Sequence, residues 1–214
     1  MKKIIVGITG ASGALLGERL VRALLDGGHE VHAIISPSGV TVFKEELGVR
    51  LGKTHPDVRR NFLKHFGNPK NLHIAPADDF AAKVSSGSSS IDAMVVMPCS
   101  MSTAASIAHG VTMNLIHRAA SVSLKERRPL ILVPRESPFS TIHLENLLKL
   151  SQVGAFIVPA TTAFYHNPKT INEMVDFTVG RVLDILKIKH KLFKRWREEE
   201  SVSHSRISGY FRED

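Results

Sequence analysis

Two charged side chains follow an apolar segment in the sequence LVPRES, residues 132–137. An arginine can hold a phosphate through paired hydrogen bonds, and a glutamate can carry a proton to or from a reacting group. An ordinary connection between a strand and a helix needs only a turn residue and a cap, so it does not explain Arg135 and Glu136. This stretch therefore predicts one wall of a polar site with catalytic chemistry.

Hydroxyl groups gather at two other predicted helix starts. The glycine-rich turn GITGASG, residues 7–13, places Ser12 beside a helix N-terminus, a favourable position for a phosphate. It matches neither a GxGxxG dinucleotide-binding sequence nor a Walker loop. The sequence PCSMST, residues 98–103, brings Ser100, Ser102 and Thr103 to a second helix start. A tight turn capped by Ser12 and an ordinary helix cap are the alternatives, but three hydroxyls within four residues favour a ligand contact.

The elements that must position these residues alternate along the chain. Apolar runs predict strands at 2–9, 30–36, 72–76, 93–100, 129–136 and 155–160. Amphipathic segments predict helices at 10–28, 40–48, 101–110, 113–127, 140–154 and 170–188. Residues 49–71 are polar and carry no clear pattern, and SSGSSS at 85–90 predicts a loop.

This alternation predicts a flavodoxin-like (Rossmann-like), doubly wound parallel sheet in a three-layer α/β/α arrangement. In such sheets, ligands bind beyond the carboxyl ends of the strands. Ser36, Ser100 and Arg135 lie at the ends of predicted strands and Ser12 comes shortly after one, so we expect them at one edge of the sheet.

The composition narrows the classes of function. Of the 214 residues, 43% are hydrophobic, which suits one compact domain, and the single cysteine excludes an internal disulfide and a thiolate zinc cluster. Cys99 is expected in the core. No apolar segment has membrane-spanning length and no signal peptide is evident, so we expect a cytoplasmic protein. The formal charge of +8 favours an anionic partner, although residues 187–200, which hold much of it, fit a solvated helix end better than a nucleic-acid patch.

Several further residues are open to two interpretations. Arg118 and Lys125 are seven residues apart, on one helical face, so they could share a phosphate or form a solvated surface. Glu46 and Glu136 could be two carboxylates for proton transfer. Tyr165 could belong to a site or be a buried, hydrogen-bonded tyrosine. The eleven histidines contain no HExxH sequence and no metal-ligand spacing, and a DDxxD segment is absent, so no metal is expected.

Three segments together resemble the UbiX family of flavin prenyltransferases, formerly described as aromatic acid decarboxylases. They are GITGASG at 7–13, MPCSMSTAASIAHGVTMNLIHRAASVSLKERRPLILVPRESP at 97–138, and PATTAFYHNP with VDFTVGRVLDIL within 159–186. The similarity runs from about residue 2 to Trp196 and is weakest between 47 and 84. It implies a flavoprotein domain at 1–188 and a C-terminal helix or tail at 189–214, which closes over the active site or packs on a neighbouring subunit.

The resemblance also implies an activity. Members of the family assemble as dodecamers with active sites where subunits meet. They join a dimethylallyl group from dimethylallyl monophosphate to reduced FMN, first at N5 and then at C6, without a metal; dimethylallyl pyrophosphate is the alternative donor. The product, prenylated FMN, serves a UbiD-type decarboxylase, in ubiquinone biosynthesis or in aromatic acid catabolism.

Roles for individual residues follow from the same resemblance. The residues implied to contact FMN are Gly10, Ala11, Ser12, Ser36, Ser100, Met101, Ser102, Thr103 and Arg135. Those implied to hold the prenyl phosphate, some from a neighbouring subunit, are Arg118, Lys125, Tyr165 and Arg181. The catalytic set is Ser12, Glu46, Lys125, Glu136 and Trp196.

Within that set, Glu136 is implied to be the acid toward the departing phosphate, and Glu46 to handle protons near the flavin, with Glu45 as its alternative. Trp196 would close over the site. The loop SSGSSS would lie near the flavin and a subunit contact.

Two other functions compete with this one. An FMN-dependent decarboxylase of peptidyl cysteine would use a catalytic histidine and a PASANT-like segment, but the corresponding PCSMST has no asparagine. A basic nucleotide-binding or nucleic-acid-binding module would explain the charge, but not the hydroxyls at the strand ends or Glu136.

Overall fold

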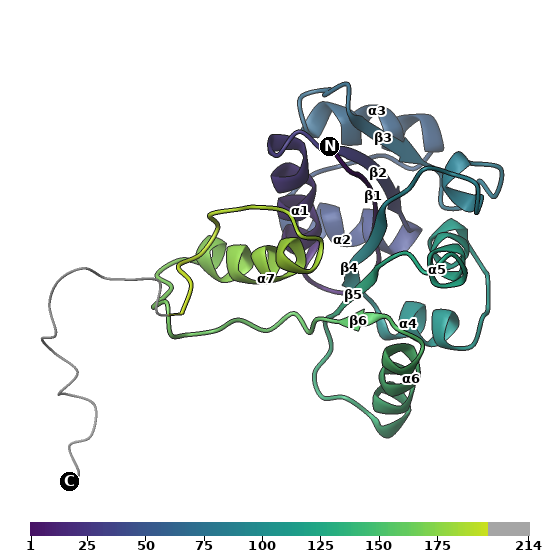
Figure 1. Ribbon diagram of the computed structural model, residues 1–214. Coiled ribbons are helices and arrows are strands. Elements are labelled where there is room, and N and C mark those ends of the chain that lie inside the picture. The colour runs from purple at the N-terminus through teal and green to yellow at the C-terminus, as the bar shows by residue number, and fades with distance from the viewer. Residues whose placement is uncertain (197–214) are drawn as a thin grey trace, which may run out of the picture.

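A computed structural model of the protein describes residues 1–196, and a parallel β-sheet lies at its centre (Figure 1). Its strands are β1 (Lys3–Ile8), β2 (Glu30–Ile35), β3 (Leu72–Ala75), β4 (Ala93–Cys99), β5 (Leu130–Pro134) and β6 (Phe156–Ile157). They stand in the order β3-β2-β1-β4-β5-β6, and all neighbouring pairs are parallel. The predicted doubly wound sheet is confirmed, in the strand order typical of a Rossmann-type fold.

Helices cover both faces of this sheet. They are α1 (Ala14–Asp26), α2 (Pro37–Leu47), α3 (His55–His65), α4 (Met101–Ala108), α5 (Leu115–Lys125), α6 (Thr141–Gln152) and α7 (Ile171–Ile185), with a short 3₁₀ helix η1 (Lys83–Ser85). Buried residues of α1, α2, α3 and α7 belong to one core cluster, and those of α4, α5 and α6 belong to a second. The sheet separates the two clusters, so the predicted three layers are confirmed.

The central strands face both clusters, which explains why their sequences are apolar without interruption. In β1, Ile4 and Val6 belong to the α1–α7 side, whereas Ile5 belongs to the α4–α5 side. In β4, Val95 and Val96 divide in the same way. Packing on both faces fixes where each strand ends, and hence where the following loop begins.

Helix α3 lies in the segment whose sequence shows no clear pattern. Its start is well formed, because the Thr54 side chain accepts a hydrogen bond from Asp57 N–H and a proline occupies the first turn. It buries only Val58 and Phe62, so its apolar stripe is too narrow to stand out in a polar sequence.

The last predicted strand is shorter than expected. Only Phe156 and Ile157 form β6. The chain nevertheless continues beside β5, since Val158 N–H donates to Leu132 O and Ala160 N–H to Pro134 O, each at 2.9 Å.

The chain after α7 also differs from expectation. Helix α7 ends at Ile185, and residues 186–196 form no regular helix, so the interpretation of 187–200 as a helix end is wrong for the part described. This segment returns along α7 (Figure 1), where the Phe193 ring lies 4.9 Å from the Phe177 ring. No helix within residues 1–196 is both long and apolar enough to cross a membrane.

Candidate active site at the carboxyl edge of the sheet

The strand order reverses between β1 and β4, and ligands of doubly wound sheets bind at such a switch point. The buried side chain of Thr9 ties the two strand ends together there: its hydroxyl donates to Pro98 O and accepts from Ser100 N–H, both at 2.8 Å. The end of β2 is joined as well, because Ser36 N–H donates to Ile8 O at 3.0 Å. Three strand ends are therefore held in one place.

The N-terminus of α1 holds a carboxylate at this edge. Glu46, near the end of α2, accepts from Gly13 N–H at 2.9 Å and from Ala14 N–H at 2.7 Å. Gly13 has φ of 114°, a conformation that glycine adopts without strain. No side chain of this turn caps α1, so the alternative interpretation of Ser12 as a cap is wrong, and Ser12 is instead exposed. The helix start thus binds a negatively charged group, as expected from its dipole.

Of the two adjacent glutamates, Glu46 is the one that reaches this edge. Glu45 pairs with Lys44 at 2.7 Å, and its side chain is 64% exposed. The hydrogen bond and charge of Lys44 lower the pKa of Glu45. Glu45 therefore makes a surface ion pair, while Glu46 binds the backbone of α1.

Arg135 joins Ser12 and Glu46 from a third segment. Its Nε donates to Ser12 O at 3.1 Å, and its backbone N–H donates to Cys99 O at 3.4 Å. Its Nη groups make no hydrogen bond within residues 1–196. A guanidinium, a hydroxyl and a carboxylate thus converge at the switch point, a combination that can bind a phosphate and move a proton.

The start of α4 adds the predicted hydroxyls. Ser100 caps the helix by accepting from Thr103 N–H at 3.3 Å, and its Oγ lies 3.1 Å from Ser102 Oγ and 3.0 Å from Thr103 Oγ1. Met101 and Thr103 are buried and Ser102 is exposed. Ser36 caps α2 in the same manner, accepting from Gly39 N–H at 3.0 Å. One hydroxyl of the group forms the cap, which leaves the exposed Ser102 available to a ligand.

The glycine turn serves the packing of the protein itself. A Cβ atom at Gly10 would lie 2.4 Å from Ser38 Cβ, so only glycine lets the β1–α1 turn approach α2 this closely. Ala11, next to it, is buried. Close packing against α2 is therefore one reason for a glycine at position 10. The predicted approach of this backbone to a ligand stays a prediction.

Two residues at the ends of β4 and β5 differ in exposure. Glu136 is half-buried, and its Oε1 accepts from Ser137 N–H at 3.1 Å. Cys99 is fully buried, which raises the pKa of its thiol to about 12. The thiol stays protonated at neutral pH, so the prediction of Cys99 as a core residue rather than a nucleophile is confirmed.

The two cations of α5 stand apart from this group. Arg118 and Lys125 are both exposed, and Lys125 Nζ pairs with Glu126 at 3.0 Å. Helix α5 begins beside the carboxyl end of β3, where Leu115 N–H donates to Ala77 O, and it ends shortly before β5. Lys125 therefore lies toward the amino edge of the sheet, about 16 Å along the helix from its start.

The predicted loop SSGSSS lies beside Lys125. Arg128 donates to Gly87 O and Ser89 O and so fixes the loop next to α5. A Cβ atom at Gly87 would lie 3.1 Å from Lys125 Nζ. Lys125 and this loop therefore form one exposed surface.

The remaining predicted residues gather around α7. Tyr165 is 44% exposed rather than a buried tyrosine, and the Trp196 ring stands edge-on to it at 5.2 Å. Arg181 donates to Asp184 at 3.0 Å, and Arg195 donates to the same carboxylate at 2.7 Å. Asp184 thereby ties the segment that carries Trp196 to α7. Arg181 also borders a hollow of about 300 Å³.

The structure thus places the predicted residues in two groups. Ser12, Glu46 and Arg135 meet at the carboxyl edge with the hydroxyls of α4 and α2. The second group lies on α5 and α7, which cover opposite faces of the sheet (Figure 1). Lys125 of α5 and Arg181 of α7 therefore do not meet within one chain.

One residue important to this geometry has no role in the sequence interpretation. Thr9 was visible only as a hydroxyl at the end of a predicted strand. Its partners are Pro98 and Ser100, about ninety positions away in the chain, with separations of 89 and 91. A threonine directly after a buried strand is the only local signal of this contact.

Comparison with known proteins agrees with this geometry. The sequence profile of the flavoprotein family matches residues 1–195. The flavin prenyltransferase UbiX of Alkalihalophilus pseudofirmus is 47% identical over 198 residues, which cover 92% of this chain and 97% of that protein.

Two solved structures are similar as well. AnUbiX (PadA1) in complex with FMN and dimethylallyl pyrophosphate has a TM-score of 0.81 and 39% identity, covering 93% of this chain and 99% of its own. A dodecameric FMN-dependent UbiX-like decarboxylase from Escherichia coli O157:H7 has a TM-score of 0.79 and 42% identity, covering 91% and 98%.

The competing decarboxylase interpretation receives support at the level of the fold alone. The FMN-dependent cysteine decarboxylase TvaF is 18% identical with a TM-score of 0.55, covering 73% of this chain and 89% of its own. The much higher identity to the UbiX proteins, over nearly the whole of their length, separates the two groups. The chain belongs to the flavoprotein family, and within it to the UbiX flavin prenyltransferases.

Proposed function

We propose that the protein is a flavin prenyltransferase, which joins a dimethylallyl group from dimethylallyl monophosphate to reduced FMN. The observation that carries this proposal is the meeting of Ser12, Glu46 and Arg135 at the switch point of the sheet. The names of the relatives, and the FMN and dimethylallyl pyrophosphate in the AnUbiX complex, support the same reaction.

The residues at the carboxyl edge fit FMN. Its phosphate needs donors, and the exposed hydroxyls of Ser12 and Ser102 and the Nη groups of Arg135 supply them. The amides at the start of α1 already hold the carboxylate of Glu46, which shows their affinity for an anion. When bound, reduced flavin supplies the nucleophilic ring to which the prenyl group is attached.

Two carboxylates handle protons in this proposal. Glu46 lies beside Ser12 at the α1 turn and takes up or returns protons on the flavin side. Glu136 follows Arg135 and holds a proton for the phosphate oxygen that departs when the carbon–oxygen bond breaks.

The donor phosphate is held by cations from more than one chain. Arg118 and Lys125 on α5, and Tyr165 and Arg181 at α7, lie on opposite sides of the sheet, so one phosphate cannot use both pairs from a single chain. A neighbouring subunit that presents its α5 surface would complete the set. The dodecameric Escherichia coli relative supports an assembly of this kind. Trp196, beside Tyr165, would cover the prenyl group.

The product would be prenylated FMN, made for a UbiD-type decarboxylase. Ubiquinone biosynthesis and aromatic acid catabolism both use such a decarboxylase step, and a cytoplasmic location suits either pathway.

Anaerobic incubation of the protein with FMN, a reductant and dimethylallyl monophosphate tests the proposal. Mass spectrometry of the released flavin should show the mass of FMN plus one five-carbon prenyl unit. A parallel reaction with dimethylallyl pyrophosphate identifies the preferred donor. If FMN binds but neither donor yields a heavier flavin, the protein is a flavoprotein of another activity. If calorimetry shows binding of neither oxidised nor reduced FMN, the flavin proposal is wrong.

A further inference from the structure

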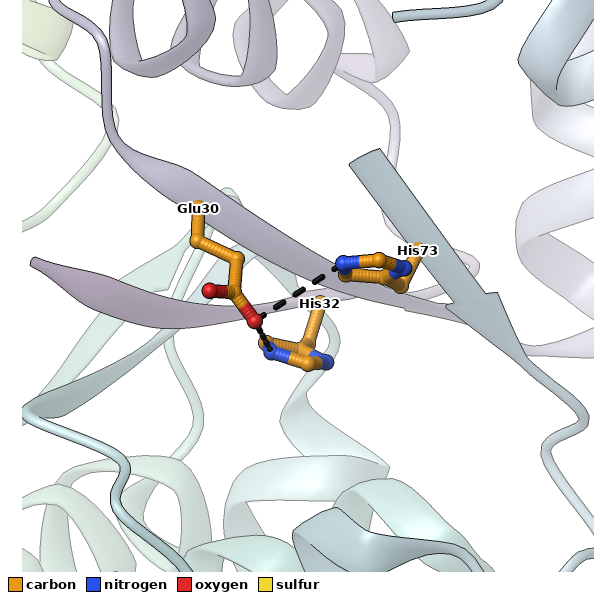
Figure 2. A group of neighbouring side chains, drawn as sticks. All are labelled: Glu30, His32 and His73. Atoms are coloured by element: carbon orange, nitrogen blue, oxygen red, sulfur yellow. Dashed lines mark hydrogen bonds and ion pairs between the residues drawn. The ribbon is translucent and has the colours of Figure 1, made fainter. Parts of the chain in front are cut away.

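A second cluster of polar side chains lies on the sheet, far from the carboxyl edge. Glu30 and His32 belong to β2, and His73 belongs to the neighbouring edge strand β3 (Figure 2). They lie near the amino ends of these strands, whereas the candidate active site follows the carboxyl ends. The proposed prenyl transfer uses none of the three residues.

The backbone of the sheet brings these side chains together. Glu30 and His32 are two residues apart on one strand, so they point to the same face. His32 and His73 are direct partners in the parallel β2–β3 pairing, which places their side chains next to each other. The arrangement therefore rests on two hydrogen-bonded strands rather than on a flexible loop.

The distances within the cluster are those of a ligand set. Glu30 Oε1 lies 2.8 Å from His32 Nε2 and 3.7 Å from His73 Nε2, and one ligand atom from each residue lies within 4.8 Å of the others. The distance from Glu30 Oε1 to His73 Nε2 is longer than a hydrogen bond, so hydrogen bonding alone does not explain why both rings face one oxygen. Ligand atoms around a tetrahedral zinc ion are about 3.3 Å apart for bonds of about 2.0 Å.

The protonation states of Glu30 and His32 suit a metal. Burial lowers the pKa of His32, against the opposing effect of its hydrogen bond to Glu30, so its ring is neutral at neutral pH. Burial raises the pKa of Glu30, but the hydrogen bond from His32 and the charge of Lys3 outweigh it, so the carboxyl is ionised. Neutral imidazole and carboxylate are the forms that bind metals.

The surroundings leave room for a further ligand. A hollow of about 720 Å³ opens in front of the cluster, bounded by β2, β3 and the loop that contains Ser86 and Ser88. Two lysines, Lys3 and Lys83, line this hollow. Lys3 Nζ lies 3.7 Å from Glu30 Oε2, the carboxylate oxygen that does not face the histidines.

We infer that Glu30, His32 and His73 bind a divalent transition-metal ion of the zinc class, with an open coordination position toward this hollow. Two imidazoles and one carboxylate are a common zinc ligand set, and the hollow has space for water as the fourth ligand. The ion would join the edge strand β3 to β2 and so stabilise the end of the sheet. The sequence did not reveal this site, because His73 lies 41 positions beyond His32 and no local spacing links the two histidines.

Zinc titration of the full chain after treatment with EDTA tests this site. We expect one Zn²⁺ per chain and visible ligand-field absorption with Co²⁺. The melting temperature should rise on addition of Zn²⁺, because the ion binds only the folded protein. His73→Gln should weaken Zn²⁺ binding by about tenfold or more, since even outer-shell changes commonly cost that much. Lys3→Met should strengthen it, because a competing positive charge is removed.

His55→Gln is the matched control, because His55 belongs to α3 and lies outside the cluster. His73 is half-exposed at 51%, so glutamine should be tolerated there, and equal melting temperatures without metal would verify this. The site is supported if His55→Gln binds Zn²⁺ as the unmodified chain does while His73→Gln does not. Equal Zn²⁺ affinity in the unmodified chain and His73→Gln, or no binding to either, would overturn it and leave a hydrogen-bonded cluster only.

Discussion

The two groups of candidate site residues differ in how the fold holds them. At the carboxyl edge, Glu46 and Arg135 are fixed by hydrogen bonds to the backbone of residues 12–14, the segment that carries Ser12. On the helix surfaces, Lys125 and Arg181 are exposed and pair with an acid on, or directly after, their own helix. The first group is complete within one chain, whereas the second is divided between opposite faces of the sheet.

This difference predicts a division of tasks. A ligand of the first group needs only one folded chain, because its donors are already oriented. A ligand of the second group needs cations that a neighbouring subunit presents, so its binding depends on assembly. FMN binding and donor binding should therefore respond differently to substitutions in the two groups.

The largest effect is expected at Glu136, which belongs to the carboxyl edge but is proposed to act on the donor. Glu136→Gln should bind both ligands and turn over ~10²–10⁴-fold more slowly, the usual contribution of general acid catalysis. The flavin absorbance change after mixing the reduced FMN enzyme with donor measures the rate. Glu145→Gln, an exposed glutamate on α6, is the control and should be near normal. An unchanged rate in Glu136→Gln would remove this carboxyl from the chemistry.

The next effect tests the division between subunits. Lys125→Ala should weaken donor binding by roughly 1.5 to 3 kcal/mol, the contribution of a charged hydrogen bond, while FMN affinity stays near normal. Lys149→Ala is a matched control, because Lys149 is likewise an exposed lysine in the last turn of a helix. Equal losses of FMN and donor affinity would show that Lys125 is structural.

Co-expression of the Lys125→Ala and Arg181→Ala chains extends this test. If each site takes the lysine from one chain and the arginine from another, about a quarter of the sites in randomly mixed assemblies contain both intact residues. Activity should then exceed that of either variant alone. No recovery in demonstrably mixed assemblies would contradict a site that takes the lysine from one chain and the arginine from another.

A smaller effect is expected at the junction of β1 and β4. Thr9→Val removes the hydroxyl that joins Pro98 to Ser100 and leaves both backbone groups without that partner. The free energy of unfolding should fall by about 1–3 kcal/mol, and FMN affinity should fall with it, because the strand ends separate. Denaturant unfolding and calorimetry measure the two quantities. Thr178→Val should have less effect, because the buried Thr178 makes one long hydrogen bond of 3.4 Å. An unchanged FMN affinity would contradict the role given to Thr9.

These contacts show what the sequence could and could not predict. Strands buried on both faces have continuous apolar sequences, so β1, β4 and β5 were predictable, and so was the edge at which Ser12 and Arg135 arrive. The polar helix α3 was not, because burial of Val58 and Phe62 alone leaves little periodicity. Pairwise contacts such as Thr9 with Ser100 depend on which strands become neighbours, and no local pattern specifies that.

The same limit applies to the division of the site. The spacing of Arg118 and Lys125 indicates a shared helix face, but not which face of the sheet that helix covers. In the sequence alone, nothing separates Arg181 from other surface cations. The structure shows that α7 covers the face of the sheet opposite to α5. The sequence thus supplied the chemistry of the site residues, while the topology determined which of them can meet.

The smallest effect concerns how the second group is held near α7. Burial raises the pKa of Asp184, but hydrogen bonds from Arg195 and His190 outweigh it, so the pKa lies below its ordinary value. A lowered pKa in the folded state means that this contribution is present above the ordinary carboxyl pKa, about 4, and is lost as the pH falls through the folded value. The segment carrying Trp196 should therefore stay docked at neutral pH and loosen only in acid.

Fluorescence of the single tryptophan reports this change, because Trp196 contacts Tyr165 in the docked segment. Asp184→Asn should show at pH 7 the emission that the unmodified chain reaches only in acid, and FMN affinity should stay the same. Asp176→Asn is the control, since Asp176 is also on α7 but pairs with Arg19 of α1. Identical emission of Asp184→Asn and the unmodified chain at pH 7 would show that packing of Phe193 against Gly180 and Phe177, rather than the ion pairs, holds Trp196 in place.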